Sequence, residues 1–224
     1  MQSVLITGAN RGLGRATAKK FLSEGYRVIG TSTPGTADYS HENLSFLQLD
    51  LRSPESIAQC AGELATRGER FDIVLNNAGA LFDEDDSTLI PEKLRQTLEV
   101  NLIGTADFTE QVLPLVNRGG HIVMLSSRAG SIERTGQGAS RFPGKYPAYK
   151  IAKAALNMYM RTLAMRLKDS EITVSCIHPG WVKTDMGGEE AEITPEEAGE
   201  NIYSFAITRP ETGLFWFNGE QLPW

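Results

Sequence analysis

With 224 residues and a formal net charge of −6 at pH 7, the chain is long enough to bury a sizeable core, and we expect one α/β domain spanning residues 1–224. The acidic balance argues against nucleic acid or an anionic membrane as a partner, because either would favour a basic surface. The sequence shows no basic leader ahead of an apolar stretch and no run of about 18 apolar residues, so we expect a cytoplasmic protein without a membrane span.

Apolar, β-rich runs alternate with helix-forming stretches along the chain. In chain order they predict a strand at 3–8, a helix at 15–25, strands at 26–32 and 44–50, a helix at 53–68, a strand at 71–79, a helix at 91–117, a strand at 119–127, a helix at 149–168, a strand at 172–180, a helix from 194 and a short strand at 214–217. This alternation implies right-handed crossovers and a doubly wound parallel sheet with helices on both faces. In such a sheet ligands bind beyond the carboxyl ends of the strands.

A glycine-rich turn, TGANRGLG at 7–14, joins the first predicted strand to the first helix. Strand, turn and helix are the context that a nucleotide-binding fingerprint requires. Gly8 permits the tight turn, Gly12 lets the backbone approach a pyrophosphate, and Gly14 lets helix and strand pack closely. Taken alone, the motif is equally compatible with a glycine turn that binds no ligand.

The stretch PAYKIAKAALNM places Tyr149 and Lys153 four residues apart in a predicted helix. Positions i and i+4 share a helix face, so the phenol and the ammonium would lie side by side. A neighbouring cation favours the phenolate and lowers the phenol pKa from its usual value of about 10, which makes the phenol a usable proton donor and acceptor. Tyr146 and Lys150 have the same spacing, but Pro147 biases Tyr146 away from helical geometry.

TGANRGLG, NNAG at 76–79, Asn101 in EVNLIGT, the serines at 126–127, Tyr149 with Lys153, and HPGWVKT at 178–184 follow one another along the chain. In order and context they resemble the motifs of the short-chain dehydrogenase/reductases, from residue 3 to the C-terminus. The segment HPGWVKTDMGG and the ending NGEQLPW are most similar to C-factor-like and sniffer-like carbonyl reductases. The resemblance implies a single Rossmann-type domain that reduces a small-molecule aldehyde, ketone or quinone to an alcohol with NADP(H), or the reverse. The alternative is an NADP(H)-binding sensor or signalling module with little turnover.

The predicted cofactor preference depends on charge near the adenosine ribose. The second strand ends in Thr31, Ser32 and Thr33, without the acid that would bind the ribose hydroxyls of NAD, and Arg11 could pair with the 2′-phosphate of NADP. We therefore expect NADP(H) to be preferred and NAD(H) to be possible; the alternative interpretation of Arg11 is a solvated loop arginine. By resemblance, Asp50 receives the adenine amino group. With the three glycines, the other predicted cofactor contacts are Asn10, Leu13, Leu51, Asn77, Ala78, Gly79, Asn101, Tyr149, Lys153, Pro179, Gly180, Val182 and Thr184.

For the chemistry, the resemblance implies that Tyr149 donates the proton and that Lys153 lowers its pKa and positions the nicotinamide ribose. Ser127 would polarise the substrate carbonyl, with Ser126 as the competing choice. Asn101, in a kinked long helix, would hold a water that links Lys153 to solvent. The interval from Ser127 to Tyr149 is longer than in most members, and we expect its extra segment at 131–147 to form a glycine-rich loop near the substrate.

Two features are not assigned to the site. We interpret the acidic run at 83–86 as a solvated loop. His41, His121 and His178 are scattered without the spacing of zinc ligands, so no metal is expected.

The helix at 91–117 and the helix that carries Tyr149 are those through which many members of the resembled family pair. The second presents more apolar surface than one sheet-facing stripe requires, through Ala152, Ala155, Leu156, Tyr159, Met160 and Leu163. We expect a homodimer. The alternative is a monomer in which the segment at 131–147 covers this helix.

Overall fold

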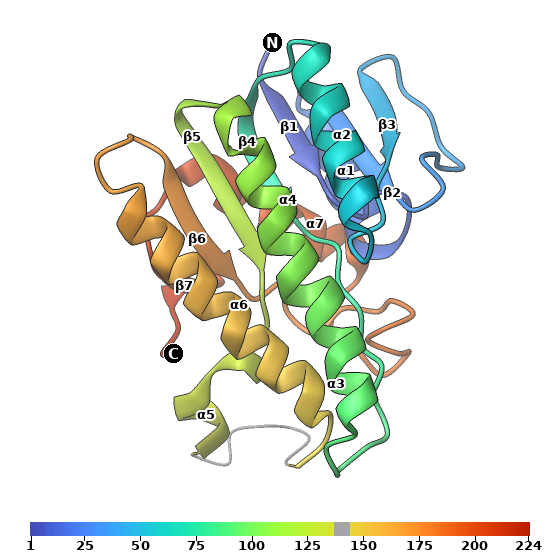
Figure 1. Cartoon of the computed structure of the whole chain (residues 1–224), viewed down its shortest axis with the longest axis vertical. Coiled ribbons are helices and arrows are strands. Elements are labelled where there is room, and N and C mark those ends of the chain that lie inside the picture. Colours follow the sequence, from blue (N-terminus) through green and yellow to red (C-terminus); the bar gives the residue numbers. More distant parts are fainter. Residues whose placement is uncertain (137–143) are drawn as a thin grey trace.

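One mixed sheet of eight strands forms the centre of the protein, in the order β3-β2-β1-β4-β5-β6-β7-β8 (Figure 1). The structure is a computed structural model that describes residues 1–136 and 144–224, so the predicted loop at 131–147 lies partly outside it. All neighbouring strands pair in parallel except β7 and β8. The strands are β1 (Ser3–Ile6), β2 (Arg27–Ser32), β3 (Leu44–Gln48), β4 (Phe71–Asn76), β5 (Val116–Leu125), β6 (Thr173–Ile177), β7 (Phe215–Phe217) and β8 (Glu220–Gln221).

Helices cover both faces of the sheet, which confirms the predicted doubly wound α/β fold. One face carries α1 (Gly12–Ser23) and α7 (Pro195–Thr208). The other carries α2 (Pro54–Thr66), α4 (Thr105–Val112) and α6 (Pro147–Arg166). A π-helical segment, Glu99–Gly104, joins α3 (Pro91–Leu98) to α4, and α5 (Ile132–Gly136) follows β5. None of these described helices is long and apolar enough to cross a membrane.

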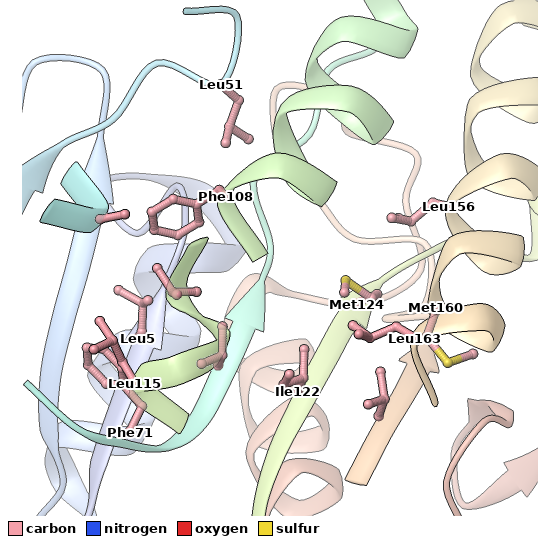
Figure 2. Close-up of a cluster of buried hydrophobic side chains, with 14 of the residues drawn as sticks. Leu5, Leu51, Phe71, Phe108, Leu115, Ile122, Met124, Leu156, Met160 and Leu163 are labelled. Atoms are coloured by element: carbon pink, nitrogen blue, oxygen red, sulfur yellow. The ribbon is translucent and has the colours of Figure 1, made fainter. Parts of the chain in front are cut away.

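The central strands are buried on both sides, as expected of parallel strands between two helical layers. Because successive side chains point to opposite faces, Leu5 belongs to the core on the side of α2, α4 and α6, whereas Val4 and Ile6 belong to the core on the side of α1 and α7. Figure 2 shows the first of these clusters, with Phe108 of α4 and Leu156 of α6 on the same face of the sheet. This packing fixes where the strands end, and therefore where the cleft described below opens.

The helices predicted to start at 53 and 194 both begin with a side-chain cap. The Ser53 side chain accepts a hydrogen bond from the Ser56 N–H at the start of α2. At the start of α7, Thr194 and Glu197 form a reciprocal capping box. Each such cap satisfies backbone groups that the helix leaves unpaired and contributes about 1 kcal/mol.

The helix predicted at 91–117 is shorter and less regular than expected. It turns π-helical at Glu99, is α-helical again to Val112, and ends in a 3₁₀ turn at Leu113–Leu115, so β5 begins at residue 116 rather than 119. Pro114 explains the early end, because a proline cannot donate the hydrogen bond that would continue the helix. The two-residue strand β8 was not predicted.

The apolar surplus predicted for α6 lies on a different face from the one expected. Of the residues on which that prediction rested, Ala152, Leu156, Met160 and Leu163 are buried in the core of the same chain. The exposed apolar side chains are instead Ile151, Met158 and Met165, which recur every seven residues along one side of the helix. The helix therefore does carry an apolar stripe that its own sheet does not cover.

Candidate active site

A cleft of about 1150 Å³ lies at the carboxyl ends of the parallel strands. It includes the point between β1 and β4 where the strand order reverses, the usual ligand site of such sheets. Every residue that the sequence predicts as a cofactor contact or catalytic group lines this cleft, with the exception of Asn101. Residues from the whole length of the chain therefore meet in one site.

The glycine loop has the backbone geometry that the sequence predicts for Gly8, Gly12 and Gly14. Gly8 and Gly12 have φ values of 67° and 51°, in the left-handed region that favours glycine. A Cβ at Gly14 would overlap the Gly8 carbonyl oxygen, so only glycine lets helix α1 start this close to β1. A Cβ at Gly12 would meet only Thr184 within 4 Å, at 3.5 Å, so the loop backbone borders open space there.

Asn77 closes the β1–β4 end of the cleft. Its amide Nδ2 donates to the carbonyl oxygens of Thr7 and Gly8, at 2.8 and 3.2 Å. The Thr7 hydroxyl accepts in return from the backbone N–H groups of Asn77 and Ala78. The NNAG turn is thus tied to the glycine loop by four hydrogen bonds between segments about 70 residues apart.

Arg11 forms an exposed ion pair with an acid of another loop. Its guanidinium lies 2.6 Å from the carboxylate of Asp185, in the loop after β6, and both side chains are exposed. Arg15, which the sequence analysis did not single out, lies one helical turn away and pairs with Asp38 at 2.8 Å. Arg11 lines the cleft, and Arg15 lines a second hollow that Arg11 and Asp38 share.

Asp50 lines the cleft, but its carboxylate already has a partner. The Arg52 guanidinium donates to both carboxylate oxygens, at 3.0 and 2.8 Å. These hydrogen bonds hold the pKa of Asp50 below its usual range. Asp50 is therefore ionised and oriented by Arg52 at neutral pH.

Asn101 binds the backbone of the turn after β4. It lies in the π-helical segment, is 1% exposed and does not line the cleft. Its amide donates to the Ala80 carbonyl at 2.8 Å and accepts from the Ala80 N–H at 2.7 Å. The side chain therefore fixes the turn after β4, beside Gly79 and Lys153, and its role in holding a water for Lys153 stays a prediction.

Tyr149 and Lys153 lie on the same face of α6, as their spacing predicts. The Lys153 Nζ is 5.6 Å from the centroid of the Tyr149 ring. It donates to the Leu125 carbonyl at the end of β5, at 2.8 Å, and the residue is 4% exposed. Ser127 follows that strand end, and its side chain forms a hydrogen bond with Tyr149. The end of β5 thus holds the lysine and presents the serine to the phenol.

The pKa values of this pair differ from the expectation. Burial raises the pKa of Tyr149 to about 12, although the hydrogen bond with Ser127 acts in the opposite direction. Burial lowers the pKa of Lys153 to about 8. The predicted lowering of the phenol pKa by Lys153 is absent from this structure, because Lys153 is not among the groups that shift it and burial disfavours the charge of the lysine itself. At neutral pH Tyr149 therefore carries its proton.

The structure also distinguishes the competing candidates. Ser126 is 3% exposed and donates its hydroxyl to the Asn157 side chain of α6 at 2.5 Å, which leaves Ser127 beside the phenol. Tyr146 precedes α6 in a left-handed conformation, with φ of 43°, yet the Lys150 Nζ lies 5.0 Å from the centroid of its ring. The Tyr146 ring also packs edge-on against Tyr149, with centroids 6.1 Å apart. The hydrogen bond with Ser127, which Tyr149 makes, is what favours Tyr149.

The acidic run at 83–86 is not a solvated loop throughout, as the sequence analysis expected. Asp83 is 1% exposed, and its carboxylate accepts from the Ala148 N–H in the first turn of α6 at 2.6 Å. The Asp86 carbonyl accepts from the Tyr146 N–H just before that helix. The run therefore caps the helix that carries the tyrosine. No local pattern predicts this, because the acid and the helix are 65 residues apart.

A second group that the sequence analysis missed lies at the end of β6. His178 is 5% exposed, lines the cleft and stacks on Phe217 with centroids 4.9 Å apart. Burial and the positive charges of Arg128 and Arg134 lower its pKa to about 3, so the ring is neutral. Among the described residues, neither His178 nor any other side chain belongs to a group of three His, Cys, Asp or Glu residues that could hold a metal ion.

The loop after β6 is closed on itself by hydrogen bonds. Trp181 donates its indole N–H to the Gly187 carbonyl at 2.8 Å. Val182 and Ile193 form a β-bridge across the two ends of the loop. Pro179, Gly180, Val182 and Thr184 thereby line the cleft from a short, braced loop.

Comparison with known proteins agrees with this geometry. The family model described as short chain dehydrogenase matches residues 2–194. The chain is 27% identical to Carbonyl reductase [NADPH] 1 of Mus musculus, over 98% of this chain and 97% of that protein. A short-chain dehydrogenase/reductase from Burkholderia multivorans with bound NADP superposes with a TM-score of 0.86, at 29% identity over 100% and 99% of the two chains. The carbonyl reductase Sniffer of D. melanogaster gives 0.86 at 26% identity, with all of both chains covered. The chain belongs to the short-chain dehydrogenase/reductase family of oxidoreductases.

Proposed function

We propose that the protein is an NADP(H)-dependent carbonyl reductase in which Tyr149 supplies the proton. The observation that carries this proposal is the meeting of a neutral phenol, a buried lysine and a serine hydroxyl at one end of the cleft. A phenol that keeps its proton at neutral pH is the form needed to protonate a carbonyl oxygen as it gains charge. The reaction converts an aldehyde, ketone or quinone to the alcohol, or runs in reverse.

The residues of the cleft fit the proposed cofactor. The open backbone at Gly12 and the positive end of α1 suit a pyrophosphate. Thr31, Ser32 and Thr33 would surround the adenosine ribose, with Arg11 for its 2′-phosphate. Gly79 lies beside Lys153, since a Cβ there would be 3.7 Å from Nζ, which suits a group packed between the NNAG turn and α6. When bound, the reduced nicotinamide would supply the hydride.

NADP(H) is the preferred cofactor in this proposal. Relatives support it, because the mouse carbonyl reductase is named for NADPH and the Burkholderia multivorans structure holds NADP. Within the chain, Arg11 places a cation in the cleft, Arg15 lines the hollow next to it, and no acid closes β2. A 2′-phosphate would compete with Asp185 for Arg11, since charge-assisted hydrogen bonds to phosphate are among the stronger ones.

Each polar group at the Tyr149 end of the cleft then has a distinct role. Tyr149 donates its proton to the carbonyl oxygen, and Ser127 stabilises the charge that develops there. Lys153, held by the Leu125 carbonyl, keeps two N–H donors for the cofactor ribose and for proton exchange. Asn101 shapes the turn after β4 through Ala80.

The test is turnover of a panel of aldehydes, ketones and quinones with NADPH, beside a separate measurement of NADPH affinity. We expect consumption of NADPH with formation of the matching alcohol, and none with Tyr149→Phe. Tight NADPH binding without turnover of any compound would overturn the reductase and favour the sensor alternative.

We further propose that two copies pair through α4 and α6. Figure 1 shows these helices next to each other on one face, and this face exposes Met158 and Met165 at 68% and 69% together with Ile103 of the π-helical segment at 51%. Such apolar area favours burial against a second copy. Light scattering during gel filtration tests this: a mass near 24.5 kDa would contradict the dimer, and Met158→Glu should dissociate it.

A further inference from the structure

The end of the cleft beyond the catalytic serine contains polar groups that the proposed reaction does not use. His178 is 5% exposed, yet neither of its ring nitrogens has a hydrogen-bond partner. The Nε atom of Arg134 is also buried without a partner. Most buried polar groups in proteins are hydrogen-bonded, because leaving one unpaired costs about 1–3 kcal/mol. Two such groups lining the same cleft point to a ligand that completes them.

The charge around these groups is positive. Arg128 and Arg134 both line the cleft, and both act on His178 closely enough to disfavour its protonation. Neither arginine forms an ion pair with a carboxylate in the described parts of the chain, 1–136 and 144–224. Other arginines of the site do have such partners: Arg11 pairs with Asp185 and Arg52 with Asp50. The two cations near His178 are therefore available to an external anion.

Acidic residues elsewhere in the cleft do not cancel this charge. Glu84 and Asp85 line it from the loop after β4, and Glu189 and Glu190 from the loop after β6. The charged groups that act on His178, however, are both arginines. The charged groups that act on His178 are thus cations, although the protein as a whole carries a net charge of −6.

The cofactor phosphates do not account for this anion site. The glycine loop follows β1, whereas His178 follows β6, and β4 and β5 lie between these strands in the sheet. Three strand spacings of about 4.8 Å each separate the two ends by roughly 14 Å. Arg128, in contrast, directly follows Ser127, so the cations border the position of the substrate carbonyl.

We propose that the substrate is an oxo acid, a carbonyl compound whose carboxylate is bound by Arg128 and Arg134 with an N–H donated by His178. This inference rests on the proposed reductase function and names its substrate class. An arginine fork matches the two oxygens of a carboxylate. A neutral histidine donates from one ring nitrogen, and stacking on Phe217 holds that ring in place. A substrate without the carboxylate would leave these groups unpaired, so it is discriminated against.

Three benzaldehydes test the substrate class: 4-carboxybenzaldehyde, its methyl ester and benzaldehyde itself. In the wild type we expect kcat/KM for the acid to exceed that for both neutral aldehydes by about tenfold or more, the value of one good charged hydrogen bond. In Arg134→Met and in Arg128→Met the ratio of acid to benzaldehyde should fall toward one. Arg95→Met, on the exposed surface of α3, is the matched control and should keep the wild-type ratio.

A binding measurement separates this inference from the reductase proposal. Calorimetry with the NADP⁺ complex should show 4-(hydroxymethyl)benzoate binding at least tenfold tighter than benzyl alcohol, with the difference lost in Arg134→Met. If this difference holds but no aldehyde is turned over, the anion site stands and the reductase function fails. If benzaldehydes are reduced with no preference for the acid, or the arginine variants keep the preference, the oxo-acid inference is overturned and the reductase function survives.

Discussion

The two halves of the cleft satisfy their polar groups in opposite ways. In the glycine-loop half, at the ends of β1 to β4, Asn77 bonds to Thr7 and Gly8, Asp50 to Arg52, and Arg11 to Asp185. In the tyrosine half, at the ends of β5 and β6 and the start of α6, His178 and Arg134 keep buried nitrogens without partners. The groups named in the glycine-loop half are paired within the protein, although the Oδ1 atom of Asn76 at the end of β4 is buried without a partner. The tyrosine half leaves an imidazole and a guanidinium nitrogen of the cleft lining unpaired.

The difference matches the two tasks that the cleft is proposed to perform. A cradle for a common cofactor gains from being rigid and fully bonded before the ligand arrives, since ordering it later would cost binding energy. A site that selects one substrate gains from groups that only the right ligand completes.

The largest effect is expected at Tyr149, the proton donor of the tyrosine half. Tyr149→Phe removes only the hydroxyl group of that ring. It should reduce kcat by about 10²–10⁴-fold, the range for loss of a general acid. NADPH affinity, measured by fluorescence titration, should change little, because the glycine-loop half is intact. Tyr146→Phe is the control and should retain activity. An inactive Tyr146→Phe with an active Tyr149→Phe would reverse the assignment.

The next largest effect belongs to the glycine-loop half. Arg11→Ala should weaken NADPH by about 10–100-fold, since a charge-assisted hydrogen bond contributes roughly 1.5–3 kcal/mol. NADH lacks the 2′-phosphate and should be nearly unaffected, so the ratio of the two dissociation constants is the readout. Equal losses for both cofactors would show that Arg11 acts on the loop rather than on the phosphate.

The pH profile should distinguish the two directions of the reaction. Lys153 is charged below its pKa of about 8, and Tyr149 is protonated below its pKa of about 12. Reduction needs both groups protonated, so it should be constant near pH 6–7 and fall about tenfold between pH 7 and 9 as Lys153 loses its proton. Alcohol oxidation needs the phenolate and should rise over the same range. A reduction rate that rises with pH would contradict this assignment.

Asp83 should affect the tyrosine half through the position of α6 rather than by contact with substrate. Asp83→Ala removes the acceptor for the Ala148 N–H and should lower stability by about 1–2 kcal/mol, or roughly 2–8 °C in Tm for a chain of this size. We expect kcat to fall several-fold with little change in NADPH affinity. Asp83→Asn keeps an acceptor oxygen at the same place and should restore most of both losses; failure of this rescue would mean that the charge itself is needed.

The smallest effect is expected from the partner of Arg11. The pair with Asp185 is exposed, and such pairs contribute at most about 1 kcal/mol. Asp185→Asn should therefore tighten NADPH by no more than about fivefold, because Arg11 no longer has to exchange partners. Glu92→Gln, which removes an equally exposed acid on α3, is the control. Weaker NADPH binding in Asp185→Asn would show that the pair supports the cofactor site instead.

Local patterns in the sequence were enough to predict the alternating architecture, the glycine loop and the pairing of Tyr149 with Lys153. These features depend on neighbours a few residues apart: Gly14 is required by contact with Gly8, and positions 149 and 153 are one helical turn apart. The helix starts at Ser53 and Thr194 were predictable for the same reason. Hydrogen bonds and steric contacts of such short range can be recognised in the order of the residues.

Contacts between distant segments were decided by the tertiary structure alone. Asp83 is expected from the sequence to be a solvated acid, but the fold buries it against the start of α6. Asn101 binds the Ala80 backbone, a contact that no local pattern predicts. The pKa of Tyr149 depends on how much water the fold excludes, and burial raises it despite the hydrogen bond with Ser127. Burial and long-range pairing belong to the packed molecule, because each depends on which surfaces meet when β5, β6 and α6 come together.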